Sequence, residues 1–262
     1  MNLTDEQLDR YARHIVLRDV GGRGQKKLLG TKVLIVGAGG LGSPMLLYLA
    51  AAGVGTLGII DDDTVDLSNL QRQIAHETAD IDLAKVKSAQ ASIERLNPDI
   101  NVIPYQTRLN KDNAQEILAE YDIVADGTDN FETRFLLNDI CFLMRKPLVS
   151  GAMLQFEGQI STFKAYEAGN NPCYRCVFPV PPSPEIAQTC GEAGVLGALA
   201  GVIGSIQAIE IIKEILGIGD SLSGRLLLFD ALSTEFRKIK ISRDPACALC
   251  GSEATISGIL LP

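Results

Sequence analysis

The stretch VLIVGAGGLGSP, residues 33–44, constrains the fold more than any other part of the chain. Four apolar residues precede Gly37, Gly39 and Gly42, whose G-x-G-x-x-G spacing joins a strand to a helix in parallel α/β folds. Gly37 permits a tight turn, Gly39 lets an anion approach the backbone, and Gly42 lets the helix pack closely on the strand. Free N–H groups at the start of the helix attract phosphate. The sequence therefore predicts a nucleotide-binding turn.

Short apolar runs alternate with helical stretches through the first 155 residues. The expected strands cover 32–36, 56–60, 100–104, 122–126 and 147–151, and the expected helices cover 41–52, 84–96, 112–120 and 131–145. This alternation predicts parallel strands joined by right-handed helical crossovers. Runs with period-2 alternation follow at 158–166, 224–231 and 235–242, which is typical of antiparallel strands. We expect an α/β fold in which a Rossmann-like, mostly parallel sheet is continued by antiparallel strands.

The chain has 262 residues, 46% of them hydrophobic and 21% charged, which is enough for one large core. We expect a single domain over 1–262. Its expected parts are N-terminal helices (1–30), a nucleotide-binding part (31–155), an antiparallel part (156–251) and a tail (252–262). Thr4, with Gln7 three residues later, predicts the cap of the first helix.

The formal net charge is −8, which disfavours binding to nucleic acid or anionic lipid through the overall field. The N-terminus has no apolar run that suits a signal peptide, so we expect a cytoplasmic protein. Residues 193–209 lack charge, but they are rich in small residues and flanked by glutamates. We expect a buried or interface helix there, not a membrane span, with close packing at Gly197, Gly201 and Gly204.

The residues after the second strand narrow the choice of nucleotide. Asp61 is placed to bind a ribose hydroxyl, and the run Asp61, Asp62 and Asp63 would repel the 2′-phosphate of NADP. Arg72 and Lys85 follow, and two such cations suit a triphosphate better than a dinucleotide. The sequence contains no G-x-x-x-x-G-K-[ST] motif, so it predicts a site unlike the P-loop.

Two acids follow the fourth expected strand. Asp126 and Asp129 lie in IVADGTDN, at the carboxyl end of the strand, where ligands bind in open α/β sheets. Carboxylates that face a polyphosphate usually share Mg²⁺ with it. The sequence therefore predicts a magnesium ion beside the nucleotide.

The six cysteines fall into three groups. CYRC and CALC are two C-x₂-C pairs, Cys173 with Cys176 and Cys247 with Cys250, and four thiolates at this spacing suit one structural Zn²⁺. Cys190 lies within the proline-rich stretch 178–194, an expected exposed loop, just before a helix. It is either a sulfur-handling thiol or a spare one.

Three further side chains of reactive type are expected to have no catalytic role. Cys141 lies in the apolar run ICFLM and is expected in the core. The chain has only two histidines, His14 and His76, and neither belongs to a recognisable catalytic arrangement.

Four motifs together resemble the ubiquitin-activating-enzyme superfamily, and within it the bacterial MoeB/ThiF/HesA branch. They are GAGGLGSP, IIDDDTVDLSNLQRQ, GTDNFETR and GEAGVLGALAGVIGS, and the resemblance runs from about Leu3 to Cys250. It implies adenylation, with Mg·ATP, of the C-terminal glycine of a small ubiquitin-like sulfur carrier ending in Gly-Gly, with release of pyrophosphate. The pathways that it implies are molybdenum-cofactor and thiamine biosynthesis.

The resemblance also implies roles for residues that match the motifs. Asp61 would bind the ribose, Asp129 would bind Mg²⁺, and Arg13 would serve the ATP of the other subunit in a homodimer. The implied set around the nucleotide is completed by Gly37, Gly39, Gly40, Gly42, Asp63, Asn69, Arg72, Lys85 and Asn130. Cys190 would act, if at all, after adenylation. The chain ends 12 residues past Cys250, so we expect sulfur to come from a separate donor protein.

Two alternatives remain open at this point. One is an inactive, zinc-stapled nucleotide-binding protein, and the other is an NAD-dependent dehydrogenase. The dehydrogenase would need a separate substrate part with an acid or base beside the hydride, and the sequence contains no clear candidate for it.

Overall fold

A single eight-stranded sheet runs through the computed structural model, which describes residues 3–182 and 193–258. The strand order is β3-β2-β1-β4-β5-β6-β7-β8. The strands are β1 Lys32–Val36, β2 Thr56–Ile60, β3 Asn101–Tyr105, β4 Ile123–Asp126, β5 Leu148–Leu154, β6 Glu157–Phe163, β7 Arg225–Asp230 and β8 Glu235–Lys240. Strands β3 to β5 in this order pair in parallel and β5 to β8 pair antiparallel, which confirms the expected fold class.

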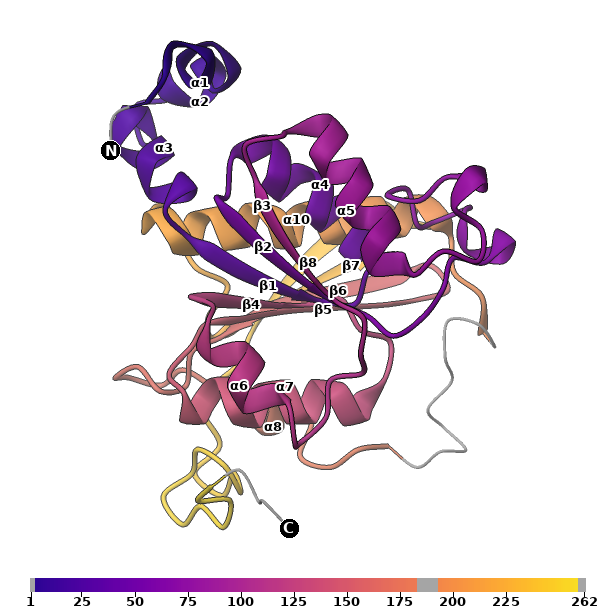
Figure 1. The fold of residues 1–262 in the computed structure, drawn as a ribbon. Helices are drawn as coiled ribbons and strands as arrows, with labels where there is room; N and C mark the ends of the chain where they lie inside the picture. Colours follow the sequence, from indigo (N-terminus) through magenta and orange to yellow (C-terminus); the bar gives the residue numbers. More distant parts are fainter. Residues whose placement is uncertain (1–2, 183–192, 259–262) are drawn as a thin grey trace.

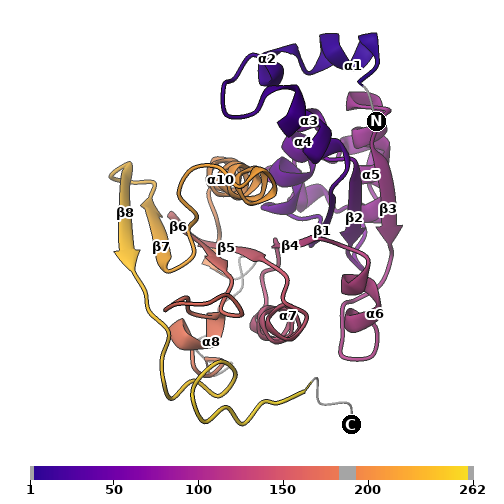
Figure 2. The same cartoon turned by 90° about the vertical axis from the view of Figure 1, so that its left-hand side faces the viewer.

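Helices cover both faces of the sheet (Figure 1). Helices α4, α5 and α10 lie on one face, and α6, α7 and α8 lie on the other, as the rotated view also shows (Figure 2). The helices are α1 Asp5–Arg10, α2 Ala12–Ile15, α3 Gly21–Leu29, α4 Gly42–Ala52, α5 Lys85–Leu96, α6 Ala114–Ala119, α7 Phe131–Leu143, α8 Tyr174–Val177 and α10 Gly197–Leu216. The expected helices of the parallel part are confirmed, with ends that differ by two residues at most.

Each face of the sheet has its own core. Leu46, Leu49 and Ile93 pack with the apolar side of α10 on one face, and Leu118 and Ile140 pack on the other. Strand β1 is buried at four of its five residues because helices cover it on both sides. A strand buried on both faces reads as a continuous apolar run, which is the pattern from which the sequence predicted this strand.

The helix that follows residue 196 is buried and does not resemble a membrane span. A Cβ at Gly204 would lie 2.5 Å from Pro44 of α4, and a Cβ at Gly197 would lie 2.1 Å from the Gln71 carbonyl oxygen. Gly201 has open space, so close packing holds at two of the three glycines. Among the described residues, no helix combines the length and the apolar composition needed to cross a membrane.

The N-terminal helix begins as the sequence predicts. The Thr4 side chain accepts a hydrogen bond from the Gln7 N–H, and the Gln7 side chain accepts one from the Thr4 N–H. This reciprocal cap satisfies two N–H groups that a helix start otherwise leaves unpaired. The helical stretch then divides into α1 and α2 at Tyr11, which is buried.

Candidate functional site

A cavity of about 330 Å³ opens at the carboxyl ends of the parallel strands. It lies where the strand order reverses between β1 and β4, the usual ligand position in such sheets. The structure brings most of the expected nucleotide-site residues into its lining. They are Gly37, Gly39, Gly40, Asp61, Asp63, Arg72, Lys85, Asp129 and Asn130.

The glycine turn after β1 tolerates no side chain at two positions. Gly37 has a φ of +95°, and a Cβ there would lie 2.9 Å from the Gly127 carbonyl oxygen. A Cβ at Gly42 would lie 1.9 Å from the Gly37 carbonyl oxygen. Gly42 does not line the cavity, so its role is the close packing of α4 on the turn. A Cβ at Gly39 would meet only Gln73, at 3.7 Å, which leaves room for a ligand to approach the backbone.

Asp61, directly after β2, is tied to the glycine turn. One carboxylate oxygen accepts the Ala38 N–H at 2.8 Å, and the other accepts the Asp63 N–H at 2.9 Å. Burial raises the pKa of Asp61, and the positive charge of Lys85 acts in the opposite direction. The carboxylate is therefore positioned by the protein itself at the cavity wall.

The two expected cations reach the cavity from different elements. The Lys85 side chain, at the start of α5, is 7% exposed, and its Nζ lies 2.7 Å from Asp63 Oδ2. Arg72 is partly exposed, and its guanidinium donates to the Ser68 carbonyl oxygen at 3.0 Å. Asn69 ends the short helix Leu67–Asn69 and is not in the lining, so its predicted contact with the nucleotide remains a prediction.

The acids after β4 differ in their surroundings. Asp126 is fully buried, and its carboxylate accepts the Ser150 hydroxyl at 2.6 Å and the Thr128 hydroxyl at 2.7 Å. Asp129 is exposed and lines the cavity. Of the two acids in the motif, Asp129 is therefore the one placed to hold a metal ion. Asn130 caps α7 by accepting the Thr133 N–H at 2.9 Å.

Two expected site residues lie elsewhere. Arg13 is exposed on α2 and is not among the lining residues. In Figure 1, α1 and α2 lie near the amino end of β1, away from the carboxyl edge of the sheet. Cys190 lies outside the described residues, so its placement is not part of this structure.

Sequence reasoning missed several residues of the lining, including Thr107, Arg108 and Arg134. Arg134, within GTDNFETR, is buried, and its Nη2 donates to the Thr128 carbonyl oxygen at 2.6 Å. Its Nε lies 3.9 Å from Asp126 Oδ2. The motif contained this arginine, but only the fold turns it toward the cavity.

A second cavity of about 290 Å³ adjoins the first. The two share Asp129, Arg134 and Met153, and the rest of the second cavity is formed by Phe131 of α7, by β5, β6 and β7, and by Arg237 of β8. A ligand that fills the second cavity therefore ends beside a ligand in the first.

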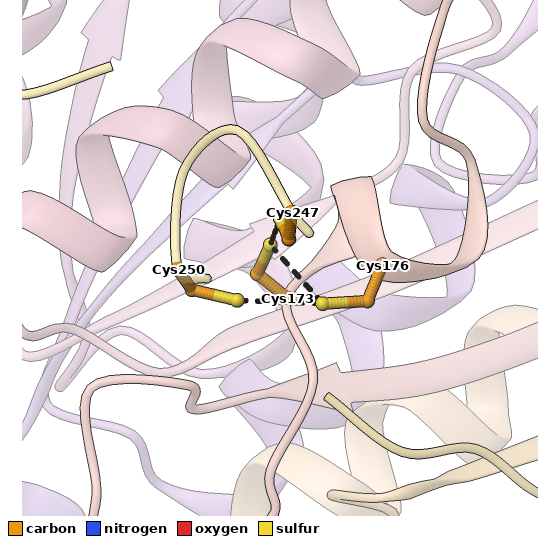
Figure 3. A group of neighbouring side chains, drawn as sticks. All are labelled: Cys173, Cys176, Cys247 and Cys250. Atoms are coloured by element: carbon orange, nitrogen blue, oxygen red, sulfur yellow. Dashed lines mark hydrogen bonds between the residues drawn. The ribbon is translucent and has the colours of Figure 1, made fainter. Parts of the chain in front are cut away.

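The four paired cysteines form one cluster, as Figure 3 shows. The Sγ–Sγ distances are 3.5 Å for Cys173–Cys247, 3.3 Å for Cys176–Cys250 and 3.9 Å for Cys173–Cys176. Tetrahedral zinc with Zn–S bonds of about 2.3 Å places its sulfurs about 3.8 Å apart. Hydrogen bonding to Cys176 and Cys250, together with burial, raises the pKa of Cys173. The cluster has the ligand set and the spacing to hold one cation.

Arg175 joins this cluster to α7. Its guanidinium donates two hydrogen bonds of 2.7 Å to the Asp139 carboxylate, and the Tyr174 N–H donates to Asn138 at 2.7 Å. Cys141, the other cysteine among the described residues, is in the core, and burial raises its pKa, which is the expected arrangement for an inert thiol.

Comparison with known structures supports this fold. E. coli MccB has a TM-score of 0.79 at 21% identity, over 96% of this chain and 76% of that chain. The crystal structure of E. coli MccB with ATP gives a TM-score of 0.77 at 22% identity, over 95% of this chain and 75% of that one.

Curated relatives are more similar in sequence. A sulfur carrier protein adenylyltransferase of Thermus thermophilus is 49% identical over 97% of this chain and 95% of its own length. The adenylyltransferase and sulfurtransferase MOCS3 of Anopheles gambiae is also 49% identical, and the match covers 98% of this chain but 58% of that protein. The model of the ThiF family matches residues 11–249. The chain belongs to the ThiF family.

Proposed function

We propose that the protein is a nucleotidyltransferase that uses ATP to adenylate the C-terminal glycine of a ubiquitin-like sulfur carrier and releases pyrophosphate. The observation that carries this proposal is the meeting of Arg72, Lys85 and Asp129 with the glycine turn in one cavity. A hydride-transfer enzyme has no need for that charge arrangement. The similar Thermus protein, matched over nearly its full length, is named as an adenylyltransferase of sulfur carriers, which supports the same activity here.

The proposed reaction joins two anions. An oxygen of the carrier's terminal carboxylate bonds to the α-phosphorus of ATP, and the bond from that phosphorus to the oxygen of the pyrophosphate breaks. A carboxylate is already ionised at neutral pH, so the step needs no general base. Catalysis then consists of charge neutralisation and in-line positioning. Arg72 and Lys85 neutralise phosphate charge, and Mg²⁺ held by Asp129 would supply further positive charge when bound.

The second cavity supports a protein tail as the other substrate. It meets the nucleotide cavity at Asp129, Arg134 and Met153, and Gly158 and Leu228 lie among its walls. A short chain end fits a space of about 290 Å³ that meets the first cavity. A terminus made of two glycines has no side chains to exclude, so it suits this passage.

The cysteine cluster supports one structural Zn²⁺ per chain. All four sulfurs are protein ligands, so a tetrahedral ion held there has no open position for a substrate. Its proposed role is to hold residues 245–250 against the segment around α8, close to α7.

Other parts of the proposal concern partners. Arg13 is exposed and does not line the cavity of its own chain, which favours a homodimer in which it serves the partner's ATP. Molybdenum-cofactor and thiamine biosynthesis are the proposed pathways. A separate donor protein supplies the sulfur, and the protein acts in the cytoplasm.

Exchange of labelled pyrophosphate into ATP tests the proposal. We expect exchange only when a carrier ending in Gly-Gly is present, and no exchange when its terminal glycine is removed. A protein that binds ATP but never supports exchange with any Gly-Gly carrier would match the inactive nucleotide-binding alternative. Binding of NADH in place of ATP would favour the dehydrogenase.

A further inference from the structure

His76 forms a hydrogen bond to the backbone of the glycine turn. Its Nε2 lies 2.9 Å from the carbonyl oxygen of Ala38, the residue between Gly37 and Gly39. Both side chains are buried, with His76 7% and Ala38 0% exposed. The Ala38 N–H is held separately, by the carboxylate of Asp61 at 2.8 Å. The Ala38 residue is therefore hydrogen-bonded through its N–H and its C=O to two different side chains.

The partners of the ring fix where its hydrogen lies. A carbonyl oxygen only accepts hydrogen bonds, so Nε2 carries a hydrogen whether the ring is neutral or charged. The other nitrogen, Nδ1, lies 2.7 Å from the Ser88 hydroxyl, which in turn lies 2.6 Å from Asp80 Oδ2. The charged groups that act on the ring are Asp80 from the short helix Thr78–Asp80, Asp61 from the end of β2, and Lys85 from α5. Ser88 and Asp80 thus keep the ring in one orientation.

The orientation of the Ala38 carbonyl decides where the next amide points. In a planar trans peptide the C=O and the N–H point in opposite directions. No cis peptide bond occurs among the described residues. With the carbonyl directed at His76, the Gly39 N–H is directed to the opposite side, and Gly39 is a lining residue of the cavity.

We propose that His76 is a positioning residue, which aims the Gly39 amide at the phosphates of the nucleotide by holding the Ala38 carbonyl. The inference rests on the proposed function for the identity of the ligand, but the hydrogen bond itself belongs to the free protein. The aimed amide donates to a phosphate oxygen without having to reorient first, so His76 acts on ATP without touching it.

Two substitutions at His76 distinguish the effect of its hydrogen bond to Ala38 from the effect of side-chain size. In His76→Gln the amide nitrogen takes the place of Nε2 and can still donate to Ala38. In His76→Asn the shorter side chain reaches only the place of Nδ1. The chain has two histidines, so His14→Asn is a matched control on α2, and it also assigns the ring signals in an NMR spectrum.

The first measurement is the ¹⁵N-detected tautomer of His76 in the free protein, which needs no ligand. We expect a hydrogen on Nε2 throughout the pH range in which the protein is folded. An Nδ1–H tautomer with bare Nε2 would overturn the proposal. This result is independent of whether the protein binds ATP, so it stands or falls apart from the proposed function.

The second measurement compares the affinities for ATP and for adenosine in folded variants. We expect His76→Asn to weaken ATP about fivefold or more, the effect of one lost hydrogen bond, and to leave adenosine unchanged. His76→Gln should restore most of the affinity, and His14→Asn should not differ from the unmodified protein. Equal losses for ATP and adenosine, or equal losses in the Asn and Gln variants, would overturn the positioning role. Failure of the unmodified protein to bind ATP would instead remove the proposed function.

Discussion

The parallel half of the sheet and its antiparallel end are stabilised in different ways. Strands β1 and β4 are buried at nearly every residue, between a helical layer on each face. Strand β8, at the other edge, is exposed at all six residues, although Phe236 stacks on Phe229 with ring centroids 4.3 Å apart. The chain beyond β8 then turns back under α7, where the four cysteines lie. Apolar burial therefore falls off toward β8. We expect the segment beyond β8 to depend on the cysteine cluster for its stability.

The polar groups of the two halves also differ in how many protein partners they have. Around the nucleotide cavity, Asp61, Asp126 and His76 each have protein partners in the free chain. Such a site is shaped before any ligand arrives, which lowers the cost of binding. The cysteine cluster makes most of its printed contacts among its own sulfurs, and the Cys176 sulfur also accepts the Asp244 backbone N–H. We expect a cation to complete this arrangement, since the four sulfurs have the spacing to hold one.

The largest expected effect follows from this dependence. Cys173→Ser and Cys247→Ser each replace a soft thiolate by a hydroxyl that binds zinc poorly. Binding of structural zinc contributes on the order of 10 kcal/mol in small zinc domains. We expect loss of the metal and a loss of several kcal/mol in the stability of the antiparallel end, measured by metal analysis and by hydrogen exchange.

Cys141→Ala is the matched control, because it removes a buried thiol that lies outside the cluster. It should retain one zinc per chain. A well-folded, unmodified protein that contains no zinc would contradict the comparison, since the antiparallel end would then be stable without its cluster.

The next effect concerns the cavity at the carboxyl ends of the parallel strands. Arg72→Ala, Lys85→Ala and Asp129→Ala should each lower carrier-dependent pyrophosphate exchange by about 10²-fold or more, because each removes charge aimed at the developing transition state. More Mg²⁺ should not restore Asp129→Ala. Lys87→Ala is the control on the same helix, since this exposed lysine does not line the cavity. Near-normal exchange in the Arg72 and Lys85 variants would remove the triphosphate assignment.

The sequence predicted the site where the chemistry depends on local spacing. Gly37, Gly39 and Gly42 lie within one turn, and a strand on one side and a helix on the other fix their geometry. The C-x₂-C pairs were equally predictable, because two cysteines in one short segment must lie close together and can bind the same ion. The positions of the parallel strands followed from apolar runs that only a doubly covered sheet can bury.

Contacts between residues that lie far apart in the sequence could not be predicted from it. Asp126 and Asp129 look equivalent in IVADGTDN, and only the arrival of Ser150 from β5 shows that Asp126 is used internally. Arg108 follows β3. Its place at the cavity depends on the parallel pairing of that edge strand with β2. The hydrogen bond from His76 to Ala38 spans 38 residues, and no periodicity encodes it.

A smaller effect concerns the stability of the protein at acidic pH. Burial lowers the pKa of His76, so the folded ring resists a proton that the unfolded chain accepts near its ordinary value of about 6.5. Between the lowered pKa and that value, the unfolded state binds more protons, and the free energy of unfolding falls as the pH falls. The slope is at most about 1.4 kcal/mol per pH unit. We expect urea unfolding between pH 7 and pH 5 to show this loss in the unmodified protein and to show less of it in His76→Gln. An identical pH dependence in both would mean that the ring is not perturbed.

The smallest expected effect lies at Cys190, outside the described residues. In the proposed reaction the attacking group comes from the carrier and the charge is neutralised by residues of the cavity, so adenylation has no step for a thiol. Any contribution of Cys190 must come after the acyl-adenylate has formed. Cys190→Ala should therefore leave pyrophosphate exchange within about threefold of normal, a change below about 1 kcal/mol. If this cysteine handles sulfur, the same variant should fail in a later transfer to the carrier, measured as thiocarboxylate formation with the sulfur donor present. Loss of exchange in Cys190→Ala, with zinc content and folding intact, would contradict this division, because the preformed cavity would then be incomplete without a residue from beyond it.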